Sequence, residues 1–370
     1  MRILLLTPYF PPEGGGLERY ALEMAGELSG EHQVRVLALT RRNSSEDHFP
    51  FPVERVRAGL VLSNTPLSLR FLLRAVEIAN SWRPDLIVVH TPVPFAADVG
   101  VLLSILKGIP LIVVYHTLGL LKGSPIDLLA KLYSTTLERL LFRRASLVVS
   151  VSPEVRDFLE KKGVHSVVIP PTLRRDLRGF TASCSRKGRV ILFVGSVSKG
   201  YSFKGLDLLL RSFLELSASF PEWQLWVVGG GGLLDAYRRR YGNFKGIRFL
   251  GRIDEPVELA EVYSKASILV LPSSFESFGL AVLEGMHFGA VPVLSPLLWE
   301  RFGGFFPSRL HSSPARQKTE LISTLNEVMA SPKALKKGCH ILKRVSEAVA
   351  RTFDSARKRA LLGVKLLEKF

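Results

Sequence analysis

The feature that most constrains this chain is a regular alternation of short apolar runs with segments of helical period. The runs are rich in Val, Ile and Leu, so a strand formed by one of them would be buried on both faces. Such strands occur in parallel sheets that are covered by helices on both sides, which predicts a doubly wound α/β domain. In the first half of the chain the expected strands are 2–7, 33–39, 86–90, 111–115 and 147–151, and the expected helices are 17–30, 66–82, 95–107, 125–143 and 154–162.

The alternation lapses between residues 170 and 188, where the sequence is polar, basic and without apolar period (PPTLRRDLRGFTASCSRKG). Such a stretch is typical of an interdomain linker, and 370 residues are enough for two domains. The alternation then restarts, with expected strands at 190–195, 224–228, 247–250, 268–271 and 291–294. We therefore predict two Rossmann-like doubly wound domains that face a cleft, with this division: an N-terminal domain at 1–170, a linker at 171–188, a C-terminal domain at 189–345, and a C-terminal helix at 346–370 that packs back towards the N-terminal domain.

Cysteine content and hydropathy bear on the compartment. The chain has two cysteines, Cys184 and Cys339, too few for a disulfide framework or for the ligands of a structural zinc. This usage predicts a reducing, cytoplasmic compartment. The apolar run at the N-terminus is shorter than the core of a signal peptide. The most apolar stretch, 99–121, is interrupted by Lys107 and a Gly-Ile-Pro sequence, which predicts a helix followed by a buried strand and not a membrane span.

Charge is unevenly distributed along the chain. Fifty Lys and Arg against 33 Asp and Glu give a formal net charge of +17, and the surplus lies in residues 101–200 and 301–370. Such clusters suit an anionic partner, whether a phospholipid surface, a polyprenyl phosphate, a nucleotide or a nucleic acid, or they form a solvated basic surface. The sequence holds no RRM, KH or helix-turn-helix pattern, so nucleic acid is not the expected partner.

A glycine-rich loop, PYFPPEGGGL, follows the first expected strand. Its glycines let backbone N–H groups approach a ligand at the start of the next helix, where the helix dipole favours an anion. Arg19 stands where a G-x-G-x-x-G pattern would need its last glycine, which disfavours a dinucleotide dehydrogenase. The loop predicts an anion site, and the alternative is a flexible turn.

Two glutamates mark the second half of the chain, in the string LVLPSSFESFGLAVLEGMHFGAVPVLS. Glu276 lies on the loop after an expected strand, and Glu284 lies in the helix that follows. The loop amides can hold phosphate oxygens, and a carboxylate nearby can accept hydrogen bonds from sugar hydroxyls. In isolation, two glutamates at this spacing are common as solvated residues.

The whole string resembles the glutamate-pair signature of retaining nucleotide-sugar glycosyltransferases with the GT-B architecture, specifically glycosyltransferase family 4 (group 1). The resemblance extends from the segment PYFPPEGGGLERYALEMAGEL to the string just quoted, and so covers nearly the entire chain. It implies an N-terminal domain for the acceptor and a C-terminal domain for the nucleotide-sugar donor.

The resemblance also implies roles for matching positions. Glu276 is similar to the glutamate that faces the hydroxyls of the donor sugar, and Glu284 to the one that binds the nucleotide ribose. The diphosphate would be held by backbone amides of both glycine-containing loops, which belong to Gly15, Gly16, Phe278, Gly279 and Leu280.

Two further positions match. His116, in IVVYHTLG, is similar to the family histidine that contacts the donor sugar near the reacting carbon. Lys204, in FVGSVSKGYSFKGLDLLL, is similar to the lysine that neutralises the departing diphosphate. His116, Lys204 and Glu276 are thus the implied catalytic residues. His90 stands at a comparable strand end, and we expect it to be a core histidine.

The chain departs from the family pattern in three places. Ser196 stands where the family usually has Arg, and either Lys199 supplies the missing charge or it is solvated. Pro171 replaces a common Asn before the linker. The stretch LLWERFGGFFPSRL replaces the usual glycine-rich, Glu-containing segment, so donor selectivity is not inferred from it.

The resemblance implies transfer of a hexosyl unit, with retention, from a nucleoside diphosphate sugar such as a UDP- or GDP-hexose to a hydroxyl of a lipid-linked or envelope glycan. We expect no cofactor and no metal, since the chain contains no Asp-x-Asp. The apolar, basic segment 107–144 favours a peripheral enzyme on the inner face of an anionic membrane, and the alternative is that its apolar residues belong to core or cleft-lining helices. The alternatives are a noncatalytic sugar-nucleotide binding protein and, less favoured, a basic nucleic-acid-binding protein.

Overall fold

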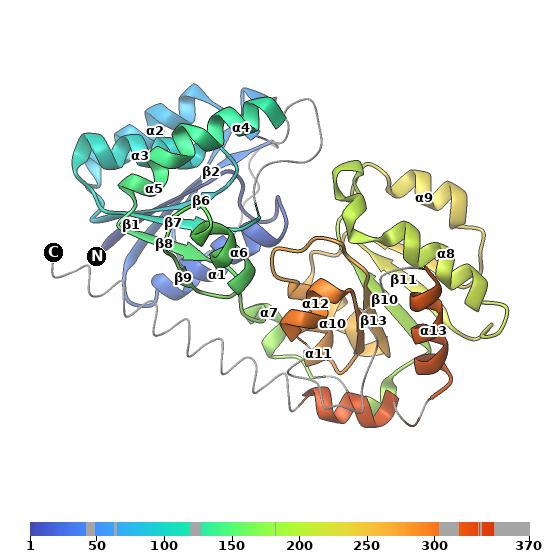
Figure 1. The fold of residues 1–370 in the computed structure, drawn as a ribbon. Helices are drawn as coiled ribbons and strands as arrows, with labels where there is room; N and C mark the ends of the chain where they lie inside the picture. The colour runs from blue at the N-terminus through green and yellow to red at the C-terminus, as the bar shows by residue number, and fades with distance from the viewer. Residues whose placement is uncertain are drawn as a thin grey trace. The chain divides into compact units, whose positions relative to one another are not determined.

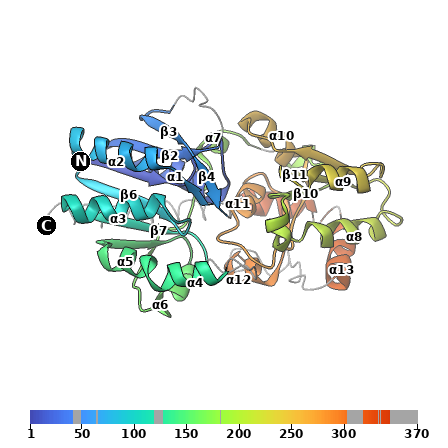
Figure 2. The ribbon, with the colours of Figure 1, turned by 90° about the horizontal axis from the view of Figure 1, so that it is seen from above.

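The computed structural model describes residues 1–41, 49–62, 65–118, 127–181, 183–302, 318–331, 333 and 335–343 (Figure 1, Figure 2). The chain divides after Pro171 into two compact units. Residues 172–188, predicted as a linker, count with the second unit and contain a short helix and a 3₁₀ turn. The predicted C-terminal helix at 346–370 lies outside the described residues.

The first unit is built on a parallel sheet with the strand order β3-β2-β1-β6-β7-β8-β9. Because β1 pairs with β2 on one side and with β6 on the other, the order of the strands reverses at β1. The elements are β1 (Arg2–Thr7), α1 (Gly16–Leu28), β2 (Gln33–Thr40), β3 (Val53–Arg57), β4 (Leu60–Leu62), β5 (Thr65–Leu67), α2 (Leu69–Ser81), β6 (Leu86–Thr91), α3 (Ala96–Lys107), β7 (Leu111–Tyr115), α4 (Asp127–Thr135), α5 (Leu137–Arg144), β8 (Leu147–Ser150), α6 (Pro153–Glu160) and β9 (Val167–Val168).

Alternate side chains of the central strands enter two apolar cores, one on each face of this sheet. Leu5 of β1 packs with α1 and α6, whereas Leu4 and Leu6 pack with α2, α3 and α5. Both faces are therefore covered, as the apolar character of the runs requires.

Two sequence expectations for this unit were wrong in detail. The helix expected at 125–143 is divided into α4 and α5, because Thr136 leaves the helical conformation with φ −118° and ψ −86°. The helix expected at 66–82 begins at Leu69, and the residues before it form β5, which pairs with β4 in an antiparallel hairpin. β3 was not expected, because it lies at the sheet edge, is only half buried and carries charged residues.

The second unit contains a parallel sheet with the order β12-β11-β10-β13-β14, and its order reverses at β10. A continuous apolar core surrounds the sheet. The elements are α7 (Arg175–Arg178), η1 (Cys184–Arg186), β10 (Val190–Val194), η2 (Lys199–Lys204), α8 (Leu206–Leu216), β11 (Gln224–Val228), α9 (Leu234–Tyr241), β12 (Ile247–Gly251), α10 (Pro256–Lys265), β13 (Ile268–Leu271), α11 (Leu280–His287), β14 (Val291–Leu294), α12 (Pro296–Phe302) and α13 (Lys318–Met329).

A disulfide joins Cys184 to Cys339, with a Cα–Cα distance of 5.8 Å. With two cysteines we expected no disulfide framework, so this bond is a correction. The two cysteines are 155 positions apart, and only the packing of the second unit brings them together. Gly289 leaves the room for Cys339, because a side chain there would overlap the Cys339 sulfur. In the part of the chain that the structure describes, no helix has the length and apolar composition needed to cross a bilayer.

Candidate functional site

Lys204 and Glu276 follow the two neighbouring strands at which the order of the second sheet reverses. Lys204 ends η2, on the loop after β10, and Glu276 lies on the loop after β13. In open α/β sheets, ligands bind outside the carboxyl ends of the strands at such a reversal. The structure thus brings together, at the expected place, two residues that are 72 positions apart in the sequence.

The Lys204 ammonium donates to Glu276 Oε1 at 2.5 Å, and both side chains are largely buried, with 18% and 10% of their surface exposed. Ser273 Oγ, fully buried, donates to the same carboxylate oxygen at 3.2 Å. A partly buried ammonium that is balanced by one carboxylate is well placed to meet an incoming anion.

The two loops are held together by backbone contacts. Ser274 N–H donates to the carbonyl of Phe203 at 2.8 Å. Gly205 has a φ of 75°, and a Cβ at this position would lie 2.5 Å from the carbonyl oxygen of Pro272. Glycine is therefore required here by the conformation and by the close approach of the neighbouring loop. Lys204 is fixed against the loop that carries Glu276.

The segment after Glu276 leads into α11. Gly279 caps the helix with a φ of 97°, and Phe278 before it is buried. The first N–H groups of a helix have no partner within it, so the amides of Gly279 and Leu280 are available for an anion. Arg301 of α12 donates to the carbonyl of Phe278 and lies over its ring. Arg301 belongs to the stretch that departs from the family pattern, and no role was predicted for it.

Glu284 lies in α11 and is buried, with 6% of its surface exposed. The Tyr263 hydroxyl, on α10, donates to Glu284 Oε2 at 2.6 Å. Burial and the carboxylate raise the pKa of Tyr263 well above its ordinary value, so the hydroxyl stays protonated. Arg174 is also buried, and although burial opposes its charged form, the hydrogen bond to Asp176 and the negative charges of Glu284 and Asp176 raise its pKa above the ordinary value. Tyr263 and Arg174 were missed in the sequence because nothing in their local pattern links them to Glu284.

The loop after β10 also carries Ser196 and Lys199, which differ in their exposure to solvent. Ser196 is half-buried and its hydroxyl is 3.4 Å from that of Ser198, whereas Lys199 is exposed. The glycine-rich segment 229–232 after β11 packs against this loop, and Val197 N–H donates to the Gly230 carbonyl at 2.9 Å. Side chains at Gly229 or Gly231 would overlap the loop. The run of four glycines after an apolar strand was a signal that could have found this contact.

In the first unit, Gly15 ends the loop after β1 and Gly16 begins α1, at the reversal of the sheet order. The N–H of Gly15 donates to the carboxylate of Glu18 at 2.5 Å. An anion that uses this amide would have to displace that carboxylate. The role of Gly15 and Gly16 in holding a diphosphate stays a prediction.

His116 directly follows β7, and His90 lies near the end of the neighbouring strand β6. His90 Nδ1 is 2.9 Å from His116 Nε2. Both rings are buried, and burial lowers the pKa of both imidazoles, to about 3 for His90. His116 thus lies at the carboxyl edge of its sheet, as the sequence predicted, and is joined to a second histidine.

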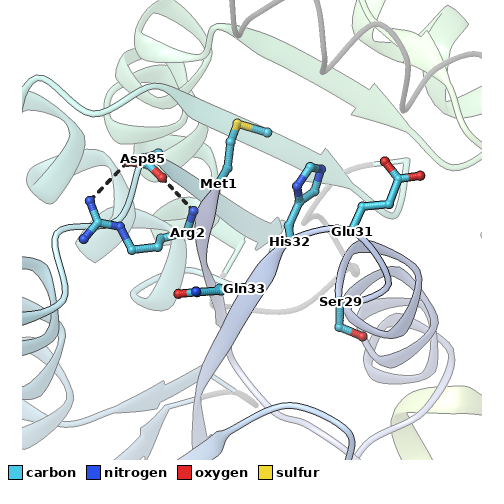
Figure 3. A pocket seen from close by; sticks show the side chains of 7 residues that line it. All are labelled: Met1, Arg2, Ser29, Glu31, His32, Gln33 and Asp85. Atoms are coloured by element: carbon cyan, nitrogen blue, oxygen red, sulfur yellow. Dashed lines mark hydrogen bonds and ion pairs between the residues drawn. The ribbon is translucent and has the colours of Figure 1, made fainter.

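The opposite edge of the first sheet has a hollow of about 480 Å³, and Figure 3 shows the side chains that line it. It lies at the amino ends of the strands, where Arg2 begins β1 and Gln33 begins β2. Arg2 pairs there with Asp85 at 3.4 Å. None of the predicted site residues lines it. Within the described ranges, no three His, Cys, Asp or Glu side chains are grouped so that they could hold a metal ion.

Family models match most of the chain. Residues 14–176 match the model for Glycosyltransferase Family 4, and residues 188–300 match that for Glycosyl transferases group 1. The chain belongs to glycosyltransferase family 4. The resemblance noted from the sequence is confirmed, and so is the prediction that the protein is a glycosyltransferase.

Named relatives of this glycosyltransferase include the D-inositol 3-phosphate glycosyltransferase of Corynebacterium aurimucosum. It is 28% identical over 342 residues, which cover 80% of this chain and 79% of the relative. The phosphatidyl-myo-inositol mannosyltransferase of Mycolicibacterium smegmatis is 28% identical over 313 residues, which cover 80% of this chain and 76% of the relative.

Solved structures of other proteins share this fold. Sucrose-phosphate synthase from Thermosynechococcus elongatus has a TM-score of 0.76 at 18% identity and covers 100% of both chains. Anabaena HepE in complex with UDP-glucose has a TM-score of 0.75 at 18% identity and covers 98% of this chain and 100% of the other. The glycosyltransferase therefore has the GT-B fold, and the predicted pair of Rossmann-like domains is confirmed.

Proposed function

We propose that this glycosyltransferase moves a hexosyl unit from a nucleoside diphosphate sugar to a hydroxyl of a lipid-linked or envelope glycan, with retention at the anomeric carbon and without a metal ion. The observation that carries the proposal is the Lys204–Glu276 pair at the strand reversal of the second unit. The UDP-glucose complex of HepE supports the donor class, and the name of the inositol lipid mannosyltransferase supports the acceptor class.

The proposed roles follow from charge and position. Lys204 meets the diphosphate as negative charge builds on its leaving oxygen, aided by the amides of Phe278, Gly279 and Leu280. Glu276, already 2.5 Å from the ammonium, accepts hydrogen bonds from the donor sugar while it keeps Lys204 in place. Glu284 accepts hydrogen bonds from the ribose, and His116 contacts the sugar near the reacting carbon.

The proposed step exchanges one bond to the anomeric carbon for another. The bond from that carbon to the diphosphate oxygen breaks, and a bond to the acceptor oxygen forms on the same face. The proton of the acceptor hydroxyl passes to the departing phosphate oxygen, so charge and atoms balance. Positioned cations and dipoles stabilise the negative charge that develops on the departing diphosphate. We assign no protein carboxylate as nucleophile.

The first experiment measures turnover of Lys204→Ala and Glu276→Ala. Each variant loses a charge-assisted contact to the site, so we expect turnover to fall at least about tenfold. Lys265→Ala is the matched control, because Lys265 pairs with Glu261 at the same 2.5 Å distance but at an exposed position on α10. Wild-type turnover in either site variant would refute the assignment.

The second experiment identifies the donor. The enzyme is given labelled UDP-, GDP- and ADP-hexoses with lipid extracts as acceptor, in the presence and absence of EDTA. We expect transfer from one donor class, unchanged by EDTA, with the anomeric configuration of the donor kept in the product as seen by NMR. Tight binding of a donor with no transfer to any acceptor would instead favour a noncatalytic sugar-nucleotide binding protein.

The acceptor proposal includes contact with an anionic membrane. Helices α2, α3 and α5 lie side by side on one face of the first sheet (Figure 2). Their outward sides carry aliphatic side chains that are 41–70% exposed, together with exposed basic residues. Apolar side chains bordered by Lys and Arg suit the interface of an anionic bilayer. The exposed aliphatic residues are Leu69, Leu73, Leu102, Ile105, Leu106, Leu137 and Leu140, and the basic ones include Lys107, Arg139 and Arg143.

Vesicle sedimentation tests this surface. Reversing two charges on α5, with Arg139→Glu and Arg143→Glu, should weaken binding to phosphatidylglycerol vesicles at least about tenfold, because each basic residue near such a surface contributes roughly 1 kcal/mol. Arg239→Glu with Arg240→Glu is the control, since it makes the same charge change on exposed α9 of the second unit. Equal loss in both double variants, or equal binding to neutral vesicles, would contradict the proposal.

A further inference from the structure

His90 and His116 form a buried pair that the fold sets in one arrangement. In the pairing of β6 with β7, Thr91 lies opposite Tyr115, and the N–H of His116 donates to the Thr91 carbonyl at 3.1 Å. The two backbones are thereby fixed against each other, and the rings are left with Nδ1 of His90 2.9 Å from Nε2 of His116.

Tyr20 of α1 fixes both rings further. Its ring packs edge-on against His116, with 5.0 Å between the ring centres, and against His90, with 6.2 Å. Its hydroxyl donates to the Ile169 carbonyl at 2.8 Å, so the phenol itself is anchored. Neither imidazole can rotate without disturbing this packing.

Both imidazoles are neutral at ordinary pH, because burial lowers the pKa of each, and the neighbouring His90 lowers that of His116 further. A neutral imidazole carries one N–H and one bare nitrogen. Two neutral rings 2.9 Å apart therefore share one hydrogen bond, in which either His90 or His116 is the donor.

The other nitrogen of His90 decides between the two arrangements. His90 Nε2 is buried and has no hydrogen-bond partner among the residues that the structure describes. If His116 were the donor, His90 would carry its proton on Nε2 and bury an N–H without an acceptor. If His90 is the donor, only a lone pair is left unpartnered there. Buried N–H groups without partners are rarer than unpartnered acceptors, so the second arrangement is favoured.

We propose that His90 is a positioning residue that donates from Nδ1 to His116 Nε2 and thereby holds His116 as the Nδ1–H tautomer. Nδ1 of His116 then presents a hydrogen-bond donor to an oxygen of the bound donor sugar. The contact between His116 Nδ1–H and the donor sugar rests on the proposed function, whereas the tautomer assignment does not. The sequence expectation that His90 is merely a core histidine is replaced by this role.

The first test compares two substitutions of His90. His90→Asn keeps an N–H donor, since the side-chain amide nitrogen takes nearly the place of Nδ1, whereas His90→Phe keeps the ring and loses the donor. We expect His90→Phe to lower kcat about tenfold or more with little change in KM for the donor, and His90→Asn to recover most of that loss. The melting temperatures of the two variants are compared, so that a packing defect is recognised.

The second test reads the tautomer without any turnover. Side-chain ¹⁵N signals separate protonated from bare ring nitrogens, and the chain has only eight histidines to label. The His116 signals are those missing from His116→Gln. We expect His116 in the wild-type protein to be protonated at Nδ1, and this preference to be lost in His90→Phe and kept in His90→Asn.

The two tests separate failure of this inference from failure of the proposed function. Protonation of wild-type His116 at Nε2, or an unchanged tautomer in His90→Phe, would overturn the inference even in a fully active enzyme. Equal kcat loss in the Asn and Phe variants at equal stability would do so as well. A protein that transfers no sugar but shows the expected tautomers would keep the tautomer assignment and lose the proposed function.

Discussion

Tyr263→Phe removes a single hydroxyl from the second unit and leaves the ring in place. That hydroxyl donates to Glu284 Oε2 at 2.6 Å, and Tyr263 has none of its surface exposed while Glu284 has 6%. Water cannot easily replace the lost donor, so the carboxylate stays buried with one partner fewer. Hydrogen bonds to charged groups contribute about 1.5–3 kcal/mol, so the unfolding free energy should fall by that amount.

Tyr237→Phe is the matched control for this prediction. The Tyr237 hydroxyl donates to Asp207 Oδ2 at the same 2.6 Å, but this pair lies at the surface, where water can take its place. Loss of this surface hydrogen bond should lower the unfolding free energy by roughly 0.5 kcal/mol or less. The difference between the two variants therefore measures the effect of burial at constant chemistry.

Urea unfolding of the two variants gives the stability changes, and titration calorimetry with the free nucleoside diphosphate gives the affinity. Because Tyr263 orients the carboxylate that we propose to bind the ribose, Tyr263→Phe should also weaken nucleotide binding about tenfold, while Tyr237→Phe should leave it unchanged. Equal stability losses in the two variants would refute the burial argument, and unchanged nucleotide affinity in Tyr263→Phe would refute the role of Tyr263 in holding Glu284.

Two further predictions concern the segment 172–188. Cys184→Ser opens the bond to Cys339, which closes a loop of 155 residues, so the urea unfolding free energy should fall by about 2–5 kcal/mol, and a reductant should have the same effect on the wild type but none on the variant. Burial lowers the pKa of Lys187 from 10.5 to about 7, so the folded state binds fewer protons than the unfolded state between these values, and stability should rise with pH across that window. Lys187→Met should reduce the slope of unfolding free energy against pH between 7 and 10 by up to about 1.4 kcal/mol per pH unit, and an equal slope in both proteins would contradict the assignment.

The fold could be predicted from the sequence to a large extent. The runs that form β7 and β10 are apolar throughout, and β1 is apolar from Ile3 to Leu6, so these strands must be buried between neighbouring strands and the helices that cover both faces of the sheet. Less regular elements were missed because they lack such an apolar run or a visible break in the helical period. β3 carries charges because it lies at an edge, and Thr136 divides an apparently continuous helix through a local conformation that no period reveals.

The candidate site could be predicted in part. Lys204, Glu276 and Glu284 are found from the segments that resemble the family, because Lys204 and Glu276 lie on loops that follow expected strands and Glu284 lies in the helix after Glu276. The residues that contact them cannot be found in this way. Tyr263 belongs to a different helix from Glu284, and Arg301 reaches the carbonyl of Phe278 from α12. Such contacts depend on how helices pack across a sheet, which the local spacing of residues does not encode.

The sequence by itself determined the alternation of strands and helices, the family, and the loops on which the candidate residues lie, since all of these depend on residues close together in the chain. The tertiary structure alone decided which of these residues meet. Lys204 reaches Glu276 because β10 and β13 are neighbours, His90 contacts His116 because β6 pairs with β7, and Cys184 bonds to Cys339 across 155 positions. The pairing of strands and the packing of side chains bring distant residues within bonding distance, and both are properties of the folded chain.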